Sequence, residues 1–309
     1  MKKVFVDGGH GTTGLIIHEY ICKRDDLELI EIDSEKRKDI TARLDCISEA
    51  DVSILCLPDD AAKEIAAAAP KDAVLIDTSS AHRTDDEWTY GMPELAEDQR
   101  AKIISSKRIA NPGCHASGFI LLIRPLVDAG LLSEDALLSA FCITGYSGGG
   151  KSMIARYETA DRPSELDSPA QYALGQTHKH LPEMIKMSGI KNAPCFSPIV
   201  GDFPRGMVMT VLLHRAQLNK SAGTNEIREV LKKRYAGEKL LTVSDNIPAD
   251  GFMYSNPMAG SNGMQMYVSG NEDRILLMAS YDNLGKGASG AAVQNLNILL
   301  GTDEYTGLM

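Results

Sequence analysis

The feature that most constrains the fold is a glycine pattern that follows a short apolar strand near the N-terminus. Val4–Asp7 has the composition of a strand, and Gly8, Gly11 and Gly14 come directly after it, at the start of an apolar helical segment. Glycine allows a sharp turn and a close approach of the backbone to a phosphate, while the N–H groups and dipole of a helix start attract negative charge. This order predicts a Rossmann-type fold whose loop binds a dinucleotide, and a plain turn between strand and helix is the alternative.

The rest of the N-terminal part alternates short apolar runs with helical stretches, which is typical of a parallel sheet wound with helices. The expected helices are Leu15–Lys23 and Ala61–Ala69, and the expected strands are Leu27–Ile32, Val52–Leu57 and Val74–Asp77. After Cys114 the connections between strand candidates are longer and polar or rich in glycine, which indicates an α+β domain with a mixed or mostly antiparallel sheet. These later candidates are Leu138–Thr144, Val208–His214, Met264–Val268 and Arg274–Tyr281.

With 309 residues, 43% of them apolar, the chain is long enough for two domains with their own cores. We expect residues 1–113 to form the Rossmann-type domain and residues 114–284 to form a second, catalytic domain. Lys286–Leu300 carries apolar residues at helical spacing, so a helix within residues 285–309 is expected to return and complete the first domain. The tail Asp303–Met309 is expected to fray.

Composition favours small-molecule chemistry. A formal net charge of −10 disfavours a general nucleic-acid binder, since phosphate contacts need clustered Lys and Arg. The six cysteines form no CxxC pair and no metal-ligand spacing, so we expect reduced thiols in a cytoplasm and no metal site. The N-terminus lacks the pattern of a signal peptide, and no apolar run is long enough to span a membrane.

The residues after the second strand bear on the choice of cofactor. Asp33 lies about 20 residues beyond the glycines, where an acidic residue would hold the ribose 2′-hydroxyl of NAD. Ser34, Lys36, Arg37 and Lys38 follow it immediately and offer a hydroxyl and positive charges to the 2′-phosphate of NADP. The alternative is that these charges are simply solvated on a loop. The pattern favours NADP(H).

A cysteine in the middle of the chain is a candidate nucleophile. Cys114 follows Asn-Pro-Gly and precedes an apolar helical run, so its thiol is expected near a helix N-terminus. Such a position lowers the pKa of a cysteine and favours the thiolate that attacks a carbonyl carbon. His178 and His180, ahead of Pro182, are candidates for the proton donor and acceptor that this chemistry needs. The residues alone do not decide between the two histidines, and each is also compatible with a structural role.

The chain resembles the short form of the N-acetyl-gamma-glutamyl-phosphate reductase family, within the semialdehyde dehydrogenases. The resemblance runs from end to end in family order. The matching pieces are GGHGTTG at Gly8–Gly14, LPDDAA at Leu57–Ala62, DTSSAHR at Asp77–Arg83, YGMPEL at Tyr90–Leu95, NPGC at Asn111–Cys114, HKHLPE at His178–Glu183 and DNLGKGASGAAVQNLN at Asp282–Asn297.

This resemblance implies reduction of an acyl phosphate by NADPH through a cysteine thioester, in arginine biosynthesis, by a cytoplasmic homo-oligomer whose second domain carries catalysis and dimerisation. It implies that Cys114 is the nucleophile and that His178 or His180 is the acid and base. The expected cofactor residues are Gly8, Gly11, Thr12, Thr13, Gly14, Ser34, Arg37, Lys38, Ser79 and Asn283. The expected residues for the small acidic substrate are Asn111, Ser147, Gly148, Lys151 and Arg205.

Two segments depart from the family pattern. The family usually reads NPGCYPT, whereas His115, Ala116 and Ser117 follow the cysteine here. DTSSAHR replaces the more familiar DLSADFR, so that Ser79 aligns but its neighbours differ. The candidate nucleophile is intact, and the departures fall on the residues beside it and beside Ser79.

Three other functions compete with this interpretation. Gly145–Ser152 matches GxxxxGK[ST], the phosphate-binding loop of nucleotide hydrolases, although no later strand ends in an obvious magnesium-binding Asp. A reductase of another acyl phosphate, similar to aspartate-semialdehyde dehydrogenase, would keep the mechanism and change the substrate. A catalytically silent NADP-binding regulator would keep only the fold.

Overall fold

The computed structural model describes residues 1–219 and 222–309. The chain forms two compact units. Unit 1 comprises Met1–Gly113 together with Ala288–Met309, and unit 2 comprises Cys114–Gly287.

Unit 1 contains a parallel sheet with the strand order β2-β1-β3-β4-β6-β5. The expected parallel, Rossmann-type sheet is therefore confirmed. Its strands are β1 (Lys2–Asp7), β2 (Leu27–Ile30), β3 (Val52–Leu55), β4 (Leu75–Asp77), β5 (Thr89–Tyr90) and β6 (Arg108–Ala110). Its helices are α1 (Thr12–Cys22), α2 (Ile40–Glu49), α3 (Asp59–Ala68), α4 (Gln99–Ser105) and α9 (Gly290–Leu300).

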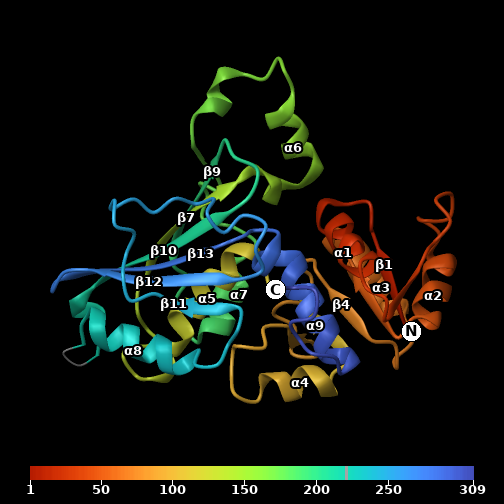
Figure 1. Cartoon of the computed structure of the whole chain (residues 1–309), viewed down its shortest axis with the longest axis horizontal. Coiled ribbons are helices and arrows are strands. Elements are labelled where there is room, and N and C mark those ends of the chain that lie inside the picture. The colour runs from red at the N-terminus through yellow and green to blue at the C-terminus, as the bar shows by residue number, and fades with distance from the viewer. Residues whose placement is uncertain (220–221) are drawn as a thin grey trace. The chain divides into compact units, whose positions relative to one another are not determined.

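Helices cover both faces of this sheet because β1 is apolar on both of its sides. Successive residues of a strand point to opposite faces. Val4 and Val6 belong to a core cluster with residues of α1 and α9, whereas Phe5 belongs to another cluster with residues of α2 and α3. Figure 1 shows α9 running beside α4 and β4, so the C-terminal segment is part of unit 1.

The C-terminal segment differs from its predicted form in two places. The helix begins at Gly290 rather than Lys286, and a π-helical turn, Gly285–Ser289, precedes it. The tail is not frayed, and that expectation was wrong. The Glu304 carboxylate accepts a hydrogen bond from Arg100 Nε over 2.7 Å, and Leu308 is only 4% exposed. Asn297 Nδ2 donates to the carbonyl oxygens of Glu304 and Thr306, so specific contacts outweigh the usual freedom of a chain end.

The described part of unit 2 contains a mixed sheet with the order β11-β12-β13-β10-β7-β9-β8. Its β7–β9 and β11–β12 pairs are parallel and the other neighbours are antiparallel, which confirms the expected mixed sheet. The strands are β7 (Ser139–Gly145), β8 (Ala170–Gln171), β9 (Cys195–Gly201), β10 (Met207–His214), β11 (Leu241–Val243), β12 (Met264–Gly270) and β13 (Arg274–Tyr281).

Helices of unit 2 pack on this sheet. The α-helices are α5 (Cys114–Asp128), α6 (Gly150–Glu158), α7 (Leu181–Ser188) and α8 (Thr224–Arg234), and short 3-10 turns span Tyr146–Gly149, Ser164–Asp167 and Arg215–Gln217. The nearly fully buried α5 contacts β10, β13, α7 and α8, so its N-terminus is held by the centre of the unit. Within the described residues, no helix is long and apolar enough to cross a membrane.

Candidate active site

The glycine loop of unit 1 has a geometry that only glycine allows at two positions. Gly8 has φ +82°, and a Cβ added there would lie 2.3 Å from the carbonyl oxygen of Cys56. A Cβ on Gly14 would lie 2.5 Å from the carbonyl oxygen of Gly8. Helix α1 begins at Thr12, so the backbone N–H groups of a helix start come directly after the loop. These features fit a cradle for a dinucleotide pyrophosphate.

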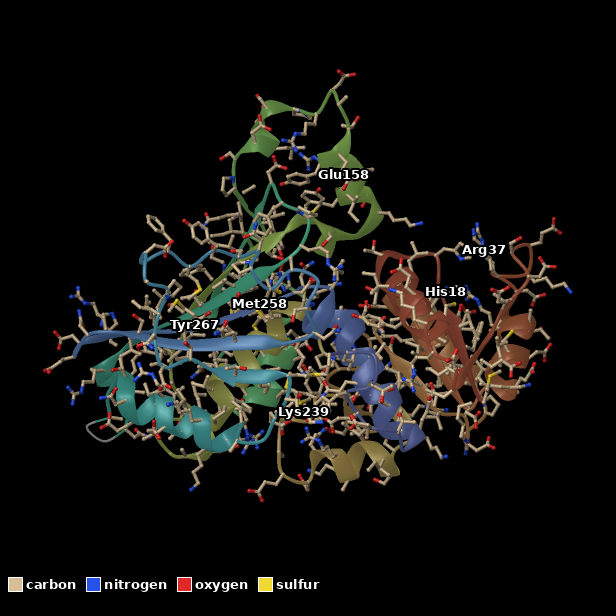
Figure 2. The ribbon with its side chains drawn as sticks, in the orientation of Figure 1. His18, Arg37, Glu158, Lys239, Met258 and Tyr267 are labelled. Atoms are coloured by element: carbon tan, nitrogen blue, oxygen red, sulfur yellow. The ribbon has the colours of Figure 1, made fainter. Side chains whose placement is uncertain are left out.

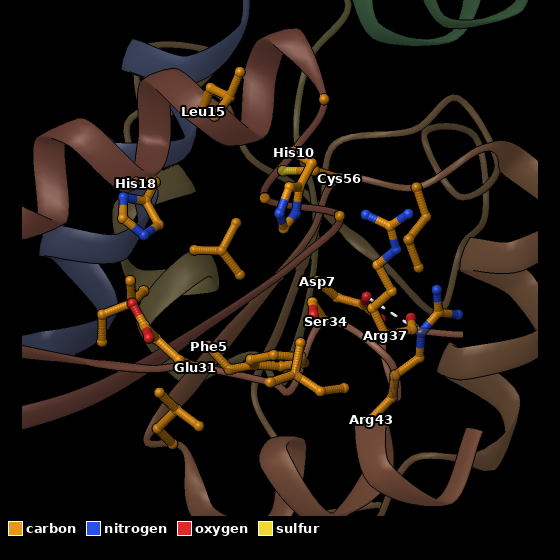
Figure 3. A pocket seen from close by; sticks show the side chains of 18 of the residues that line it. Phe5, Asp7, His10, Leu15, His18, Glu31, Ser34, Arg37, Arg43 and Cys56 are labelled. Atoms are coloured by element: carbon orange, nitrogen blue, oxygen red, sulfur yellow. Dashed lines mark hydrogen bonds and ion pairs between the residues drawn. The ribbon is translucent and has the colours of Figure 1, made fainter. Parts of the chain in front are cut away.

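A cavity of about 880 Å³ opens beside this loop within unit 1. Figure 3 shows His10 of the loop on one side and Ser34 and Arg37, from the segment after β2, near Asp7. Figure 2 shows Arg37 and His18 on the same unit. Of the predicted cofactor residues, the cavity brings together Gly8, Gly11, Ser34, Arg37 and Lys38. Thr12, Thr13 and Gly14 follow directly in the first turn of α1.

Ser79 does not line this cavity. Its hydroxyl donates to Asp77 Oδ2 over 2.7 Å and accepts from the Ala81 N–H over 3.1 Å. Asp77 also binds His82 Nδ1 at 2.7 Å, and the His82 ring stacks on Trp88 with centroids 4.0 Å apart. Because the Ser79 hydroxyl takes part in this buried turn, its contact with a cofactor stays a prediction.

Asp7 and Arg43 are among the charged residues of the cavity that sequence reasoning missed. Asp7, at the end of β1, is 2% exposed, and its Oδ1 lies 3.4 Å from Nε of Arg43 on α2. Burial raises the pKa of Asp7 to about 6, although Arg43 and the Gly8 N–H act in the opposite direction. An acidic residue at the end of an otherwise apolar strand was a visible signal, whereas nothing in the sequence separates Arg43 from a solvated helix residue.

In unit 2, α5 begins at Cys114, as its sequence position predicts. The Tyr281 hydroxyl donates to the carbonyl oxygen of Cys114 over 2.7 Å and accepts from the Gly118 N–H over 3.1 Å. Gly287 lies against the nucleophile, since a Cβ there would come within 3.0 Å of Cys114 Cβ. Burial, together with negative charge at Cys142 and Cys114, raises the pKa of Tyr281 well above its ordinary value, so its phenol stays a donor.

Three histidine rings meet beside the start of α5. The centroid of His115 lies 5.2 Å from that of His178 and 5.6 Å from that of His180, and the last two centroids are 4.7 Å apart. Nε2 of His115 lies 2.6 Å from the hydroxyl of Tyr172. Burial, with smaller effects of His178 and Lys179, lowers the pKa of His115 to about 3. His115 is therefore neutral near pH 7.

The two predicted acid–base candidates differ in their surroundings. The backbone N–H of His180 donates to Nδ1 of His178 over 3.1 Å, which requires an unprotonated Nδ1. His180 is 4% exposed, and its Nε2 lies 4.0 Å from Oε1 of Glu183, which is also buried. His180 thus has a buried carboxylate 4.0 Å from its ring, whereas Nδ1 of His178 is already used by a backbone hydrogen bond.

Four predicted residues of unit 2 gather at the ends of β7 and β13. The side chain of Asn283 accepts from the Gly206 N–H and donates to Ser147 Oγ, both over 2.9 Å. Gly148 lies beside it, since a Cβ there would come 3.5 Å from Asn283 Nδ2. Arg205 Nη2 lies 2.6 Å from Oδ2 of the fully buried Asp282. The predicted residues Ser147, Gly148, Arg205 and Asn283 therefore form one cluster.

The other two predicted substrate residues lie elsewhere. Lys151 is exposed on α6. Asn111 is buried in unit 1, where Nδ2 donates to the carbonyl oxygen of Ala288 over 3.0 Å and Oδ1 accepts from Asn295 Nδ2 over 3.3 Å. Asn111 thus anchors the segment that leads, in the sequence, to Cys114.

The segment Gly145–Ser152 does not have the geometry of a phosphate-binding loop. The N–H groups of Gly145, Tyr146 and Ser147 donate to the carbonyl oxygens of Gly206, Phe203 and Pro204 over 3.0, 3.0 and 3.1 Å. A phosphate cradle needs such N–H groups to point at the ligand. The nucleotide-hydrolase alternative is therefore not favoured. The described residues include no group of three or more metal-binding side chains either.

Fold and site define an oxidoreductase with a dinucleotide-binding unit and a second unit that carries a cysteine at a helix start. The chain belongs to the semialdehyde dehydrogenase family. Residues 5–103 match the family model described as "Semialdehyde dehydrogenase, NAD binding domain", and residues 114–283 match "Semialdehyde dehydrogenase, dimerisation domain". A catalytically silent regulator is the less favoured interpretation within this family.

Curated relatives and solved structures agree with this assignment. N-acetyl-gamma-glutamyl-phosphate reductases of Brucella ovis and Brucella melitensis biotype 2 are each 43% identical over 309 residues, which covers 97% of this chain and 99% of theirs. An aspartate semialdehyde dehydrogenase from Francisella tularensis matches with a TM-score of 0.74 at 16% identity, over 97% of this chain and 100% of that one. Aspartate semialdehyde dehydrogenase II from Vibrio cholerae gives 0.71 at 17% identity, over 97% and 98%. The structural matches show the fold.

Proposed function

We propose that this chain reduces N-acetyl-gamma-glutamyl phosphate to the corresponding semialdehyde with NADPH, in arginine biosynthesis. The observation that carries the proposal is the placement of Cys114 at the first position of α5, in the same unit as the histidine rings of His115, His178 and His180. The relatives at 43% identity are named for this activity.

The cysteine would act as the nucleophile. Its thiolate attacks the acyl carbon, the C–O bond to phosphate breaks, and a thioester remains on Cys114. NADPH would supply the hydride that reduces this thioester to a thiohemiacetal, and the C–S bond to Cys114 would then break to release the semialdehyde and the thiolate. The backbone N–H groups of the first turn of α5 lie at the same helix start as Cys114, which suits them to stabilise the negative oxygen of these intermediates.

His180 is the better candidate for the acid and base. The ring must accept a proton when the semialdehyde forms or donate one in the reverse direction, and the Glu183 carboxylate, 4.0 Å from Nε2, is placed to orient it. His178 would instead orient the segment through its bond to the His180 N–H. Ser147, Arg205 and Asn283 form the cluster that we assign to substrate and nicotinamide.

The cofactor is NADP(H), held by residues 1–113 together with 285–309, and residues 114–284 supply catalysis and dimerisation. Gly8 and Gly11 would receive the pyrophosphate, and Ser34, Arg37 and Lys38 would receive the 2′-phosphate. The matched dimerisation model supports a homo-oligomer, a dimer or a tetramer. We further propose that the enzyme acts in the cytoplasm, as the reduced state of its cysteines would require.

The test is phosphate-dependent reduction of NADP⁺ by N-acetylglutamate semialdehyde, followed at the nicotinamide absorbance. The native chain is compared with Cys114→Ala and with Cys195→Ala, which changes an exposed cysteine. We expect activity to disappear only with Cys114→Ala. Turnover of aspartate semialdehyde instead would keep the mechanism and refute the substrate, whereas full activity of Cys114→Ala would refute the thioester.

A further inference from the structure

A buried carboxylate of unit 1, Asp7, lines the proposed cofactor cavity. Oδ1 of Asp7 lies 3.4 Å from Arg43 Nε, whereas its other oxygen, Oδ2, is buried and has no hydrogen-bond partner in the described structure. Both residues line the cavity, and Figure 3 shows the Asp7 and Arg43 side chains joined by this ion pair, with Ser34 and Arg37 nearby. A buried carboxylate is stable only when it is paired or hydrogen-bonded, so Asp7 depends on its pairing with Arg43.

Arg43 is held in place by two contacts. Its Nε donates to the carbonyl oxygen of Arg37 over 2.8 Å, in addition to its approach to Asp7. Its side chain is 15% exposed, and its position on α2 is fixed by the helix rather than by a loop. An arginine that is partly desolvated and already oriented loses less conformational entropy on binding than an exposed lysine of a loop.

We propose that Asp7 and Arg43 act as one pair that selects NADP(H) over NAD(H). The guanidinium of Arg43 binds the 2′-phosphate through the N–H groups that Asp7 and the Arg37 carbonyl do not use. Asp7 is a positioning residue, which keeps the guanidinium turned toward the cavity. The pair adds a rigid, helix-borne cation to Ser34, Arg37 and Lys38. This inference rests on the proposed cofactor site of unit 1.

Loss of Arg43 from this pair should weaken phosphate binding more than loss of one cation from a simple positive patch. Arg43 lowers the pKa of Asp7, so the variant is measured at a pH well above 7, where the Asp7 carboxyl is ionised. When Arg43 is replaced under these conditions, the carboxylate stays in the cavity and repels the phosphate. Arg43→Gln should therefore weaken NADPH binding about tenfold or more, because a lost charge-assisted hydrogen bond and an uncompensated carboxylate act together. NADH has no 2′-phosphate, so its dissociation constant should change by about twofold at most.

The experiment measures binding and does not depend on turnover. Dissociation constants of NADPH and NADH are obtained from nicotinamide fluorescence for the native chain, Arg43→Gln, Asp7→Asn and the double variant. Adenosine 2′,5′-bisphosphate serves as a competitor that carries the 2′-phosphate without the nicotinamide. Lys36→Ala is the matched control, because Lys36 belongs to the same charged segment but does not line the cavity.

We expect Arg43→Gln to raise the dissociation constants of NADPH and of the bisphosphate by similar factors. The increase should be about threefold smaller when Asp7 is already Asn, because the repulsion is then absent. If Arg43→Gln weakened NADPH and NADH equally, or weakened NADPH equally with Asp7 and with Asn at position 7, Asp7 and Arg43 would not act as a selective pair. Unchanged NADPH binding in Arg43→Gln would overturn this inference and leave the proposed function standing. A native chain that binds NADH but not NADPH would overturn both.

Discussion

The hydroxyl of Tyr281, at the end of β13, donates a hydrogen bond to the carbonyl oxygen of Cys114, the first residue of α5. The same hydroxyl accepts from the Gly118 N–H, one turn further along the helix. A side chain from the sheet thus fixes the helix start on which the proposed nucleophile lies. A larger residue at Gly118 would disturb this contact, because a Cβ there would come 2.6 Å from the hydroxyl.

Replacing Tyr281 by Phe should lower kcat and stability together. The change removes two hydrogen bonds to the backbone of α5, which costs about 1–3 kcal/mol, and it loosens the first turn of this helix. Thermal unfolding and kcat of the purified variant measure the two effects. Tyr254→Phe is the control, because Tyr254 is 57% exposed. An active variant of native stability would show that the contact has no role in holding the nucleophile.

The two neighbouring histidines should differ in their effect on the reaction. We expect His180→Asn to reduce kcat by about 10²–10⁴-fold and to remove a limb of its pH profile, because general acid–base catalysis contributes about that factor. His178→Asn should cost less and should keep the limb, since its Nδ1 accepts a structural bond. The reverse order of the two variants would assign the acid and base to His178.

Asp7 should make stability depend on pH. Its pKa is raised to about 6 in the folded chain from 3.8, so the folded state binds the proton more tightly and stability falls as pH rises from about 4 to about 6. Asn cannot ionise, so the free energy of unfolding of Asp7→Asn should not fall in this way. Relative to the native chain it should increase by about 1–3 kcal/mol as the pH rises over this range. Urea unfolding at several pH values between 4 and 8 measures the difference. A difference that does not change with pH would contradict the burial of an ionising carboxyl.

Removing the C-terminal tail should destabilise unit 1. Truncation after Thr302 deletes Glu304, which binds Arg100 and Gln294, and Leu308, which is buried. Loss of one buried apolar side chain and of these bonds should cost about 2–4 kcal/mol. The midpoint of thermal unfolding tests this, with removal of Met309 alone as the control because its side chain is 83% exposed. A truncated chain with a native midpoint would restore the expectation of a frayed end.

Local sequence patterns were sufficient for the parts of this protein that depend on neighbours in the chain. The glycines after Val4–Asp7 predicted the turn between β1 and α1, because positive φ and close backbone approach are local demands. The apolar run after Cys114 predicted a helix start at the cysteine for the same reason. The family resemblance predicted the reduction of an acyl phosphate and an acid–base histidine, but it did not choose between His178 and His180.

Tertiary structure decided what depends on residues far apart in the chain. Only folding places Tyr281 on Cys114, Asn283 on Ser147 and Arg43 beside Asp7, and no periodicity in the sequence encodes such pairs. The pKa of Asp7 and the order of the tail likewise follow from burial, which is a property of packing. The sequence by itself determined the Rossmann-type unit, its glycine loop and the position of the candidate nucleophile on a helix start. The surroundings of the nucleophile and the charges of the cofactor cavity were decided by tertiary contacts, because hydrogen bonds and desolvation act between groups that only the folded chain brings together.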